Sequence, residues 1–456
     1  MRSFIAIALG MGIVLAATAA LAGERSEEEI AQLGGPKLTP MGAERAGNAA
    51  GTIPEWKGGV PKPPAGWQPG QARIDVFADD RVLFTIDASN VDEHADKLSP
   101  GQIELIKAYD GYTMNVYPSR RSCGLPERYY ENAKQNARIS RVDDECFLRD
   151  GIRSPLFPLP KTGCEVIQNG KLSTFSGLIG YDRMEATLVP TKSGNFVPIR
   201  RRQKLLFLSQ DPKNTTFAEL EGIWTKSLSH TVAPAKLAGE MTLVHALTDG
   251  HLKAWTYNPG QRRVRRAPNF EYDNPVPGWQ GLVTIDAVNG YVGAADRYDW
   301  KLVGKQELYV PYNNHKFFDS SLKYKDVVQG RYPRRDLIRY ELHRVWVVEG
   351  TVRADKRHVI AKRVFYLDED SWNFAVIDGY DTRGNLWRVQ EIVSQIIYEI
   401  PSCVSNGTIY YDLVAGRYVI SPAFNEEAEA DYLAGHTGKV ADTEYEPDDL
   451  RRLGRR

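Results

Sequence analysis

The stretch that decides the fold runs from Val359 to Tyr398 and reads VIAKRVFYLDEDSWNFAVIDGYDTRGNLWRVQEIVSQIIY. Apolar and polar residues alternate along it, and two turns, Asp368–Ser371 and Asp381–Asn385, interrupt the alternation. Alternation with a period of two is typical of strands, and such short turns join antiparallel hairpins rather than βαβ units. We therefore predict three consecutive antiparallel strands, in Val359–Leu367, Trp372–Val376 and Leu386–Tyr398.

The segment Val345-Trp346-Val347-Val348 lies upstream of these strands and is apolar at every position. Because a half-exposed strand would alternate, both faces of this strand must be covered, by a helix layer or by a lined cavity. Strand patterns dominate residues 161–420, and residues 421–456 form a C-terminal extension. The sequence therefore predicts an α+β protein, mainly antiparallel β, with a single domain over residues 75–456.

Helices are expected in the part of this domain that precedes the sheet, residues 75–160. Ser99 is a suitable N-cap, Pro100 suits the first helical position, and Gln102 completes a capping box. A second helix is expected after Pro126. Neither helix carries residues that indicate chemistry.

Residues 23–74 are predicted to form an N-terminal helix followed by an extended arm. Proline and glycine crowd residues 34–71, which excludes a long helix or a central strand there. Two tryptophans, Trp56 and Trp67, favour an arm laid across the body over a disordered leader, because exposed tryptophans are poor linker residues.

Residues 1–22 are typical of a cleaved signal peptide. A basic start precedes the apolar run Phe4–Ala17, and Ala20-Leu21-Ala22 places small residues where a signal peptidase reads them. The run is shorter than the roughly 20 residues that span a bilayer. We expect export to the periplasm, cleavage after Ala22, and a soluble protein that begins at Gly23.

The four cysteines are expected to form two disulfides, because the exported protein meets an oxidising compartment. Three pairings are possible. The short loop between Cys123 and Cys146 favours that pair, worth about 3 kcal/mol in the chain-entropy treatment. This choice leaves Cys164 and Cys403 as the second disulfide.

Charge and motifs exclude several classes of function. The 58 basic and 58 acidic residues balance, which argues against nucleic acid as a partner. The sequence has no G-x-S-x-G nucleophile elbow, no H-E-x-x-H zinc motif, no P-loop and no EF-hand calcium loop. Its eight histidines are scattered along the chain. We expect no catalytic residues, no metal and no cofactor.

A basic, aromatic segment is the most unusual part of the chain. It combines Trp255 and Tyr257 on one strand face with four arginines after a Pro-Gly turn. One interpretation is the mouth of a binding site, with guanidinium groups that hold an anionic headgroup. The other is a solvated strand end whose arginines pair with Asp273, Glu271 or the helix layer. The candidate ligand-binding residues are Trp255, Tyr257, Arg262, Arg263, Arg265, Arg266, Trp279 and Trp346.

Several long strings resemble a large periplasmic family of undefined function that is often labelled outer-membrane lipoprotein-sorting-like. They include GAERAGN at 42–48, GTIPEW at 51–56, RYDW at 297–300, YELHRVWVV at 340–348 and YLDEDSW at 366–372. The family is similar to the LolA/LolB carriers. That resemblance implies a curved half-barrel sheet closing over a helix layer around a lipid-sized cavity, with no established catalytic residues. It also implies an exporter of the resistance-nodulation-division (RND) type and an outer-membrane protein as partners.

These observations favour a carrier for a lipid or another hydrophobic molecule. The alternative is a periplasmic adaptor that docks on an exporter or outer-membrane protein without carrying cargo. A third possibility is an enzyme without a recognisable motif. A contiguous apolar cavity would favour the carrier. A filled sheet interior with an exposed surface patch would favour the adaptor, and a cleft of polar groups with shifted pKa values would favour the enzyme.

Overall fold

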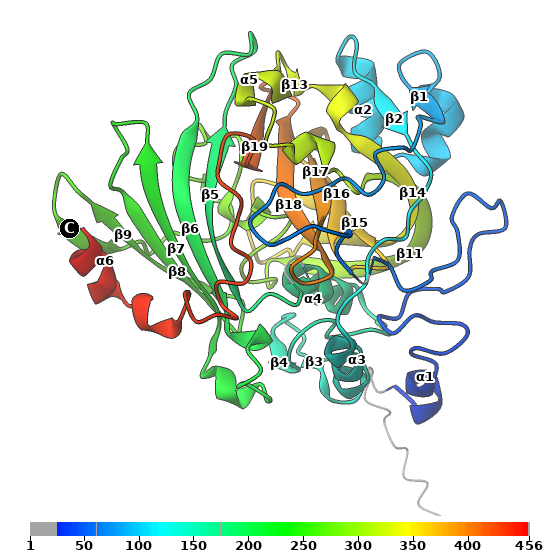
Figure 1. Cartoon of the computed structure of the whole chain (residues 1–456), viewed down its shortest axis with the longest axis horizontal. Helices are drawn as coiled ribbons and strands as arrows, with labels where there is room; N and C mark the ends of the chain where they lie inside the picture. The colour runs from blue at the N-terminus through cyan, green and yellow to red at the C-terminus, as the bar shows by residue number, and fades with distance from the viewer. Residues whose placement is uncertain (1–24, 61, 174–175, 455–456) are drawn as a thin grey trace, which may run out of the picture.

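The computed structural model describes residues 25–60, 62–173 and 176–454, and in this part of the chain fifteen strands form one sheet (Figure 1). The predicted cleavage site after Ala22 lies outside the described residues. The sheet is antiparallel except where β2 runs parallel to β14. In spatial order the strands are β1 (Phe84–Ile86), β2 (Met114–Val116), β14 (Arg339–Val352), β15 (Lys362–Asp368), β16 (Phe374–Tyr380), β17 (Leu386–Ile397), β18 (Ser402–Asp412), β19 (Arg417–Ala423), β5 (Gly180–Leu188), β6 (Ile199–Phe207), β7 (Ile223–Ala233), β8 (Met241–Leu247), β9 (Leu252–Asn258) and β10 (Arg263–Arg266), and β11 (Tyr298–Pro311) pairs with β14.

The predicted hairpins are confirmed: β15, β16 and β17 are antiparallel neighbours. The sheet remains open, with β1 and β10 at its ends, and Figure 1 shows its strands curving around α4. This is the predicted mainly antiparallel, curved half-barrel. Two small sheets lie apart from it, β3 (Arg141–Val142) with β4 (Leu148–Asp150), and β12 (Val328–Gln329) with β13 (Tyr332–Pro333).

The helices are short and lie around the sheet. The α-helices are α1 (Glu27–Ala31), α2 (Pro100–Ala108), α3 (Glu127–Ile139), α4 (Gly163–Ser173), α5 (Tyr324–Val327) and α6 (Pro447–Leu453). The 3-10 turns are η1 (Val91–Lys97), η2 (Leu208–Gln210), η3 (Ala218–Leu220), η4 (Ile285–Ala287), η5 (Lys316–Phe318), η6 (Arg335–Leu337) and η7 (Asp442–Glu444). Within the described residues, no helix has the length and apolar character required to cross a membrane.

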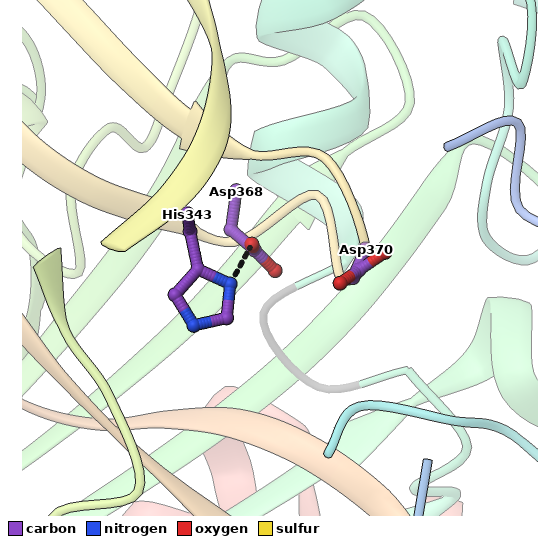
Figure 2. A group of neighbouring side chains, drawn as sticks. All are labelled: His343, Asp368 and Asp370. Atoms are coloured by element: carbon purple, nitrogen blue, oxygen red, sulfur yellow. Dashed lines mark ion pairs between the residues drawn. The ribbon is translucent and has the colours of Figure 1, made fainter. Parts of the chain in front are cut away.

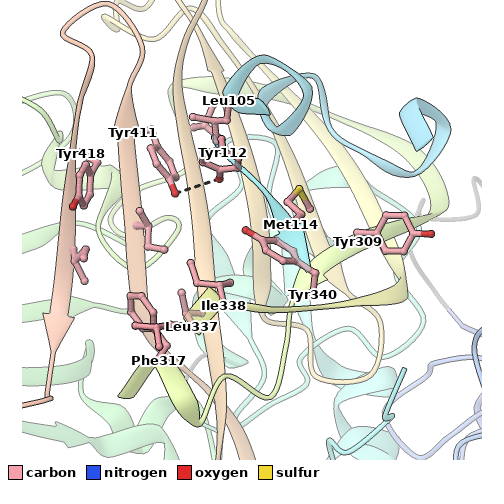
Figure 3. Packing of buried hydrophobic residues seen from close by; sticks show 14 of the residues in the cluster. Leu105, Tyr112, Met114, Tyr309, Phe317, Leu337, Ile338, Tyr340, Tyr411 and Tyr418 are labelled. Atoms are coloured by element: carbon pink, nitrogen blue, oxygen red, sulfur yellow. Dashed lines mark hydrogen bonds between the residues drawn. The ribbon is translucent and has the colours of Figure 1, made fainter. Parts of the chain in front are cut away.

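The two predicted helices are present as α2 and α3. Ser99 caps α2 by accepting a hydrogen bond from the backbone N–H of Gln102 at 3.1 Å, and the Gln102 side chain accepts one from the Ser99 N–H. The helix packs Leu105 and Ile106 onto the outer face of the sheet, beside Tyr112, Tyr340 and Tyr411 (Figure 3). The hydroxyl groups of Tyr112 and Tyr411 lie 3.3 Å apart within this cluster.

The strand β14 is covered on both faces, as its apolar sequence predicts. Val345 and Val347 pack on the outer face with Trp67 of the arm, whereas Val348 packs on the inner face against Val166 and Ile167 of α4. We call the face of the sheet that meets α4 the inner face. The half of the sheet from β14 to β17 is therefore filled on both sides.

The predicted arm lies across the body. The indole of Trp56 donates a hydrogen bond to the carbonyl of Cys123 at 2.9 Å, and Trp67 packs edge-on against Tyr398 at 5.4 Å between ring centres. Both tryptophans are buried. This packing explains why a segment rich in proline and glycine carries large aromatic side chains.

The predicted disulfide pairing is wrong: Cys123 bonds Cys403, and Cys146 bonds Cys164. The chain-entropy argument assumed a flexible loop between Cys123 and Cys146. Instead, the 13 residues of α3 lie between them, a rod of about 20 Å at 1.5 Å per residue. The helix carries the chain from Cys123, beside the outer core of the sheet, to Cys146, beside α4.

Candidate functional site

A partly enclosed cavity of about 430 Å³ lies on the inner face of the sheet, between strands β6–β9 and the segment 270–293. Its volume falls within the range of small-molecule sites. The end of α4 and Leu148 of β4 also contribute to its lining. In Figure 1 these strands form the green wing of the sheet, beyond the half that α4 fills.

The strand wall of the cavity carries small and hydroxylated side chains. In β7, Thr225, Ser227, Ser229 and Thr231 all line it, because every second residue of a strand points to the same face. The neighbouring strand β8 adds Thr242, Val244 and Ala246. This wall can donate hydrogen bonds while leaving room for a ligand.

The opposite wall is apolar and comes from the segment 270–293. Its lining side chains include Phe270, Val276, Trp279, Ile285, Val288 and Tyr291. The segment is fixed by a buried ion pair, in which Asp286 lies 2.9 Å from both Arg363 and His358. Although burial acts to raise the pKa of Asp286, the attraction of Arg363 and His358 holds that pKa well below its usual range.

Lys171, near the end of α4, brings a positive charge to this cavity. Burial lowers the pKa of Lys171 to about 8, against the opposing attraction of Asp249 and Asp296. Arg201 also lines the cavity, but its Nε donates to Glu185 at 2.7 Å, a carboxylate that it shares with Arg183.

The structure separates the residues that were predicted to form a mouth. Trp279 lines the cavity, but Trp255 and Tyr257 do not, because they lie on the outer face of β9. There α6 covers them, and the Tyr257 hydroxyl donates to the carbonyl of Gly454 at 3.0 Å. Strand alternation had placed the two rings on one face correctly, but it could not tell which face was the inner one.

The four arginines lie outside the cavity lining. Arg263, Arg265 and Arg266 are exposed on β10, the edge strand, and Arg262 is exposed in the preceding turn. The predicted pairing with Glu271 or Asp273 does not occur, since Glu271 lies 3.2 Å from His251 and Asp273 accepts the Val359 N–H. No ion pair in the described part of the chain involves any of these arginines.

Trp346 does not line the cavity either. Its ring stacks on Trp372 at 5.9 Å, with the ammonium group of Lys305 over it at 4.7 Å. Trp346 is therefore part of the packing beside α4.

A buried charge cluster lies close to the arm, where His343, Asp368 and Asp370 approach one another (Figure 2). Burial opposes protonation of His343, but Asp368, at 3.5 Å, and Glu341, at 3.2 Å, outweigh it and raise its pKa to about 9. Arg121 donates to both oxygens of Asp370. These contacts use the atoms that a metal ion would need, so the arrangement is that of an ion-pair network.

A second cavity, of about 380 Å³, lies by the arm and is polar. Its lining includes Asp75, Asp80, His315 and Arg339. Burial, together with Arg73 and Arg339, lowers the pKa of His315 to about 3, which makes this imidazole a weak base near neutral pH. Arg339 is occupied by Glu341 and Asp80, each at 2.6 Å.

Sequence reasoning missed Lys171 and most of the segment 270–293. Lys171 belongs to the pattern GCEVIQNGKLS at 163–173, whose apolar positions Val166 and Ile167 could have indicated a helix. The segment 270–293 has no strand or helix pattern apart from the short turn η4. Its position over the sheet therefore depends on tertiary contacts.

Comparison with known proteins gives three kinds of relatives. A profile of the family described as "Protein of unknown function (DUF1329)" matches residues 85–451. An uncharacterized protein of Pseudomonas aeruginosa is 39% identical over 442 residues, covering 94% of each chain.

Solved structures share less of the sequence. An outer membrane lipoprotein-sorting protein domain from Vibrio parahaemolyticus is 15% identical, with a TM-score of 0.43 over 63% of this chain and 97% of that one. A DUF1329 family protein from Desulfovibrio piger is 15% identical, with a TM-score of 0.42 over 63% and 95%. A LolA superfamily protein from Nitrosomonas europaea is 11% identical, with a TM-score of 0.35 over 60% and 94%.

Proposed function

This chain belongs to the DUF1329 family, and we propose that it is a periplasmic carrier that binds a lipid or another hydrophobic molecule in the inner-face cavity. The observation that carries the proposal is the cavity of about 430 Å³ with one apolar wall. The signal-peptide pattern of residues 1–22 supports a periplasmic location, where a hydrophobic molecule needs a protein to cross water.

The apolar wall can supply enough binding energy. Burial contributes about 0.8 kcal/mol per methylene, so a dozen methylenes give roughly 10 kcal/mol. The loss of translational and rotational freedom on association is subtracted from this value. The remainder is enough for a complex that forms and then releases its cargo.

The test uses two neighbouring residues of β7 that face opposite sides of the sheet. Ser229 lines the cavity, whereas His230 is exposed on the outer face. Ser229→Trp fills the cavity and is expected to abolish binding of the fluorescent probe N-phenyl-1-naphthylamine. His230→Trp adds the same side chain outside and is expected to leave binding unchanged.

Mass spectrometry of lipids extracted from both variants identifies the cargo, which should be depleted in Ser229→Trp alone. Equal probe binding and equal lipid content in the two variants, with unchanged melting temperatures, would overturn the proposal.

The second candidate function is an adaptor that docks on an RND-type exporter or an outer-membrane protein. The exposed arginines of β10 favour it, because they are available to a partner's carboxylates. Charge reversal of Arg263 and Arg265 would then weaken association with the exporter while probe binding persists. The carrier and adaptor functions are compatible, since the two surfaces lie on different parts of the sheet.

The polar cavity by the arm gives less support to an enzyme. A general base works best when its pKa lies near the operating pH, and that of His315 is about 3. Asp80 and Arg339 are already paired with each other at 2.6 Å. We therefore propose binding and transport rather than catalysis.

A further inference from the structure

Lys171 is a cation without a direct partner. Its Nζ makes no hydrogen bond or ion pair within the ranges that the structure describes. The carboxylates that act on it, Asp249 and Asp296, are engaged elsewhere: Asp249 accepts the His251 N–H at 3.0 Å, and Asp296 accepts the Tyr272 hydroxyl at 3.1 Å. An ammonium group offers three hydrogen-bond donors, and burying them is costly unless a partner accepts their hydrogen bonds.

The ammonium group lies at one end of the cavity. A Cβ built on Gly250, in the turn between β8 and β9, would be 3.3 Å from Nζ of Lys171. The cavity runs from this turn along β7, from Thr225 to Thr231. Six residues at 3.3 Å each give a length of about 20 Å, enough for a single extended acyl chain.

The other end of the cavity carries charges of both signs, because Arg201, the register partner of Thr231, lies there with its Nε bound to Glu185. Leu237 and Glu240 also line this end, beside the start of β8. The cavity therefore has an unpaired cation at one end, a carboxylate and a paired guanidinium group at the other, and an apolar wall with Trp279 and Val288 along its length. An elongated molecule with one anionic end would place that end at Lys171, because the guanidinium group at the other end already has a carboxylate partner.

Resting on the proposed carrier function, we propose that the cargo is an anionic, single-chain amphiphile whose headgroup binds Lys171. Its chain extends along the apolar wall toward Leu237, and its headgroup receives a further hydrogen bond from Thr225, which lines the same end. The headgroup can be a carboxylate or a phosphate monoester, since both accept hydrogen bonds from an ammonium group.

The experiment measures displacement of N-phenyl-1-naphthylamine from delipidated protein by four compounds: dodecanoate, dodecyl phosphate, dodecanol and acetate. Lys171→Met removes the charge and keeps a similar length, and Lys171→Arg restores the charge. Lys253→Met is the matched control, because Lys253 is exposed on the outer face of β9.

The inference expects dodecanoate or dodecyl phosphate to bind Lys171→Met about 10-fold to 100-fold more weakly than wild type, as for a lost charged hydrogen bond. Dodecanol affinity should remain unchanged, acetate should not compete, and Lys171→Arg should recover most of the anion affinity. The headgroup is identified by which of the two anions, dodecanoate or dodecyl phosphate, loses more affinity in Lys171→Met. Lys253→Met should bind all compounds as wild type does.

Two outcomes overturn the inference, and they differ in what they say of the carrier function. If dodecanol and the anions bind wild type, and Lys171→Met weakens none of them or all of them equally, the headgroup site is wrong and the carrier function stands. If no compound with a chain displaces the probe, or the probe itself does not bind wild type, both the headgroup site and the carrier function fail.

Discussion

Arg121 and Asp370 form a two-point ion pair beneath the N-terminal arm, with Nη2 to Oδ1 at 2.7 Å and Nε to Oδ2 at 2.9 Å. The same guanidinium group donates to backbone carbonyls of the arm, including Glu44 at 2.7 Å and Arg45 at 3.0 Å. Arg344 donates to the arm as well, to Ala46 at 2.5 Å. The arm is therefore fixed by buried guanidinium groups that lie between 76 and 298 residues away from their partners in the arm.

Replacing Arg121 by alanine should release the arm and destabilise the protein. The change leaves the Asp370 carboxylate buried without its partner, which typically costs about 3–5 kcal/mol. Arg121→Lys should recover only part of the loss, because an ammonium group lacks the planar two-point geometry. Urea unfolding and limited proteolysis between residues 44 and 72 measure both effects.

The control is Arg138→Ala, which breaks an exposed ion pair with Glu27 and should change neither stability nor proteolysis. An Arg121→Ala protein with wild-type stability and a protected arm would contradict this role of the guanidinium.

The two disulfides should differ in their contribution to stability. The bond between Cys123 and Cys403 spans 280 residues and the bond between Cys146 and Cys164 spans 18. In the chain-entropy treatment these loops correspond to about 5.6 and about 3 kcal/mol. We expect the serine pair at 123 and 403 to lower the unfolding midpoint more than the pair at 146 and 164. A peptide map of unreduced protein checks the pairing itself, and a linked Cys123–Cys146 peptide would refute it.

His343 should make stability fall as pH rises above neutrality. Its pKa is about 9 in the folded protein and about 6.5 in an unfolded chain. Between these values the folded state binds more protons, so its stability is full below pH 6.5 and is lost as pH approaches 9. Lys171 acts in the opposite direction above pH 8, because its folded pKa is lowered.

The contribution of His343 is therefore isolated as the difference between wild type and His343→Gln. That difference in melting temperature should shrink steadily from pH 6.5 to pH 9. A difference that is constant with pH would show that the imidazole is not protonated in the cluster.

The arginines of β10 should protect an open sheet edge. Like charges on an edge strand discourage pairing with a second chain. Replacing Arg263, Arg265 and Arg266 by threonine should leave the free energy of unfolding within about 0.5 kcal/mol of wild type, because these side chains are exposed and unpaired in the described structure. Sedimentation should show concentration-dependent self-association of this variant. The control is Arg262→Thr, in the turn, which should sediment as wild type does. If the triple variant also sediments as wild type does, the arginines do not protect the edge.

Local sequence patterns predicted the elements that they directly specify. The capping box at Ser99 predicted the start of α2, and alternation from Val359 onward predicted β15 to β17. The apolar run at Val345 predicted two covered faces for β14. In each case the deciding contacts lie within a few residues or within one strand.

The candidate site was harder to predict because its parts come from distant segments. Trp255 and Tyr257 share a face with each other, but only the position of α6, near the end of the chain, shows that this face is the outer one. Lys171 reaches the cavity because α4 packs against β14 and β15, through contacts with Val348 and Leu367. No local pattern reports such packing, and the same holds for the pairing of the cysteines across α3.

Binding of an anionic amphiphile should weaken as pH rises through the pKa of Lys171. That pKa is about 8, lowered by burial. Below pH 8 the ammonium group is charged and attracts the headgroup. Above pH 8 each further pH unit lowers the population of the charged, binding-competent form about tenfold.

Dodecanoate is fully ionised throughout this range, so a change in its affinity reports on the protein. The other charged groups that act on Lys171 or line the cavity are Asp249, Asp296, Arg201 and Glu240. We expect dodecanoate affinity to fall about tenfold from pH 7 to pH 9 in wild type and to stay constant in Lys171→Arg, whose guanidinium remains charged. Dodecanol affinity should not change with pH in either protein, and an equal fall for dodecanoate in both proteins would assign the effect to a group other than Lys171.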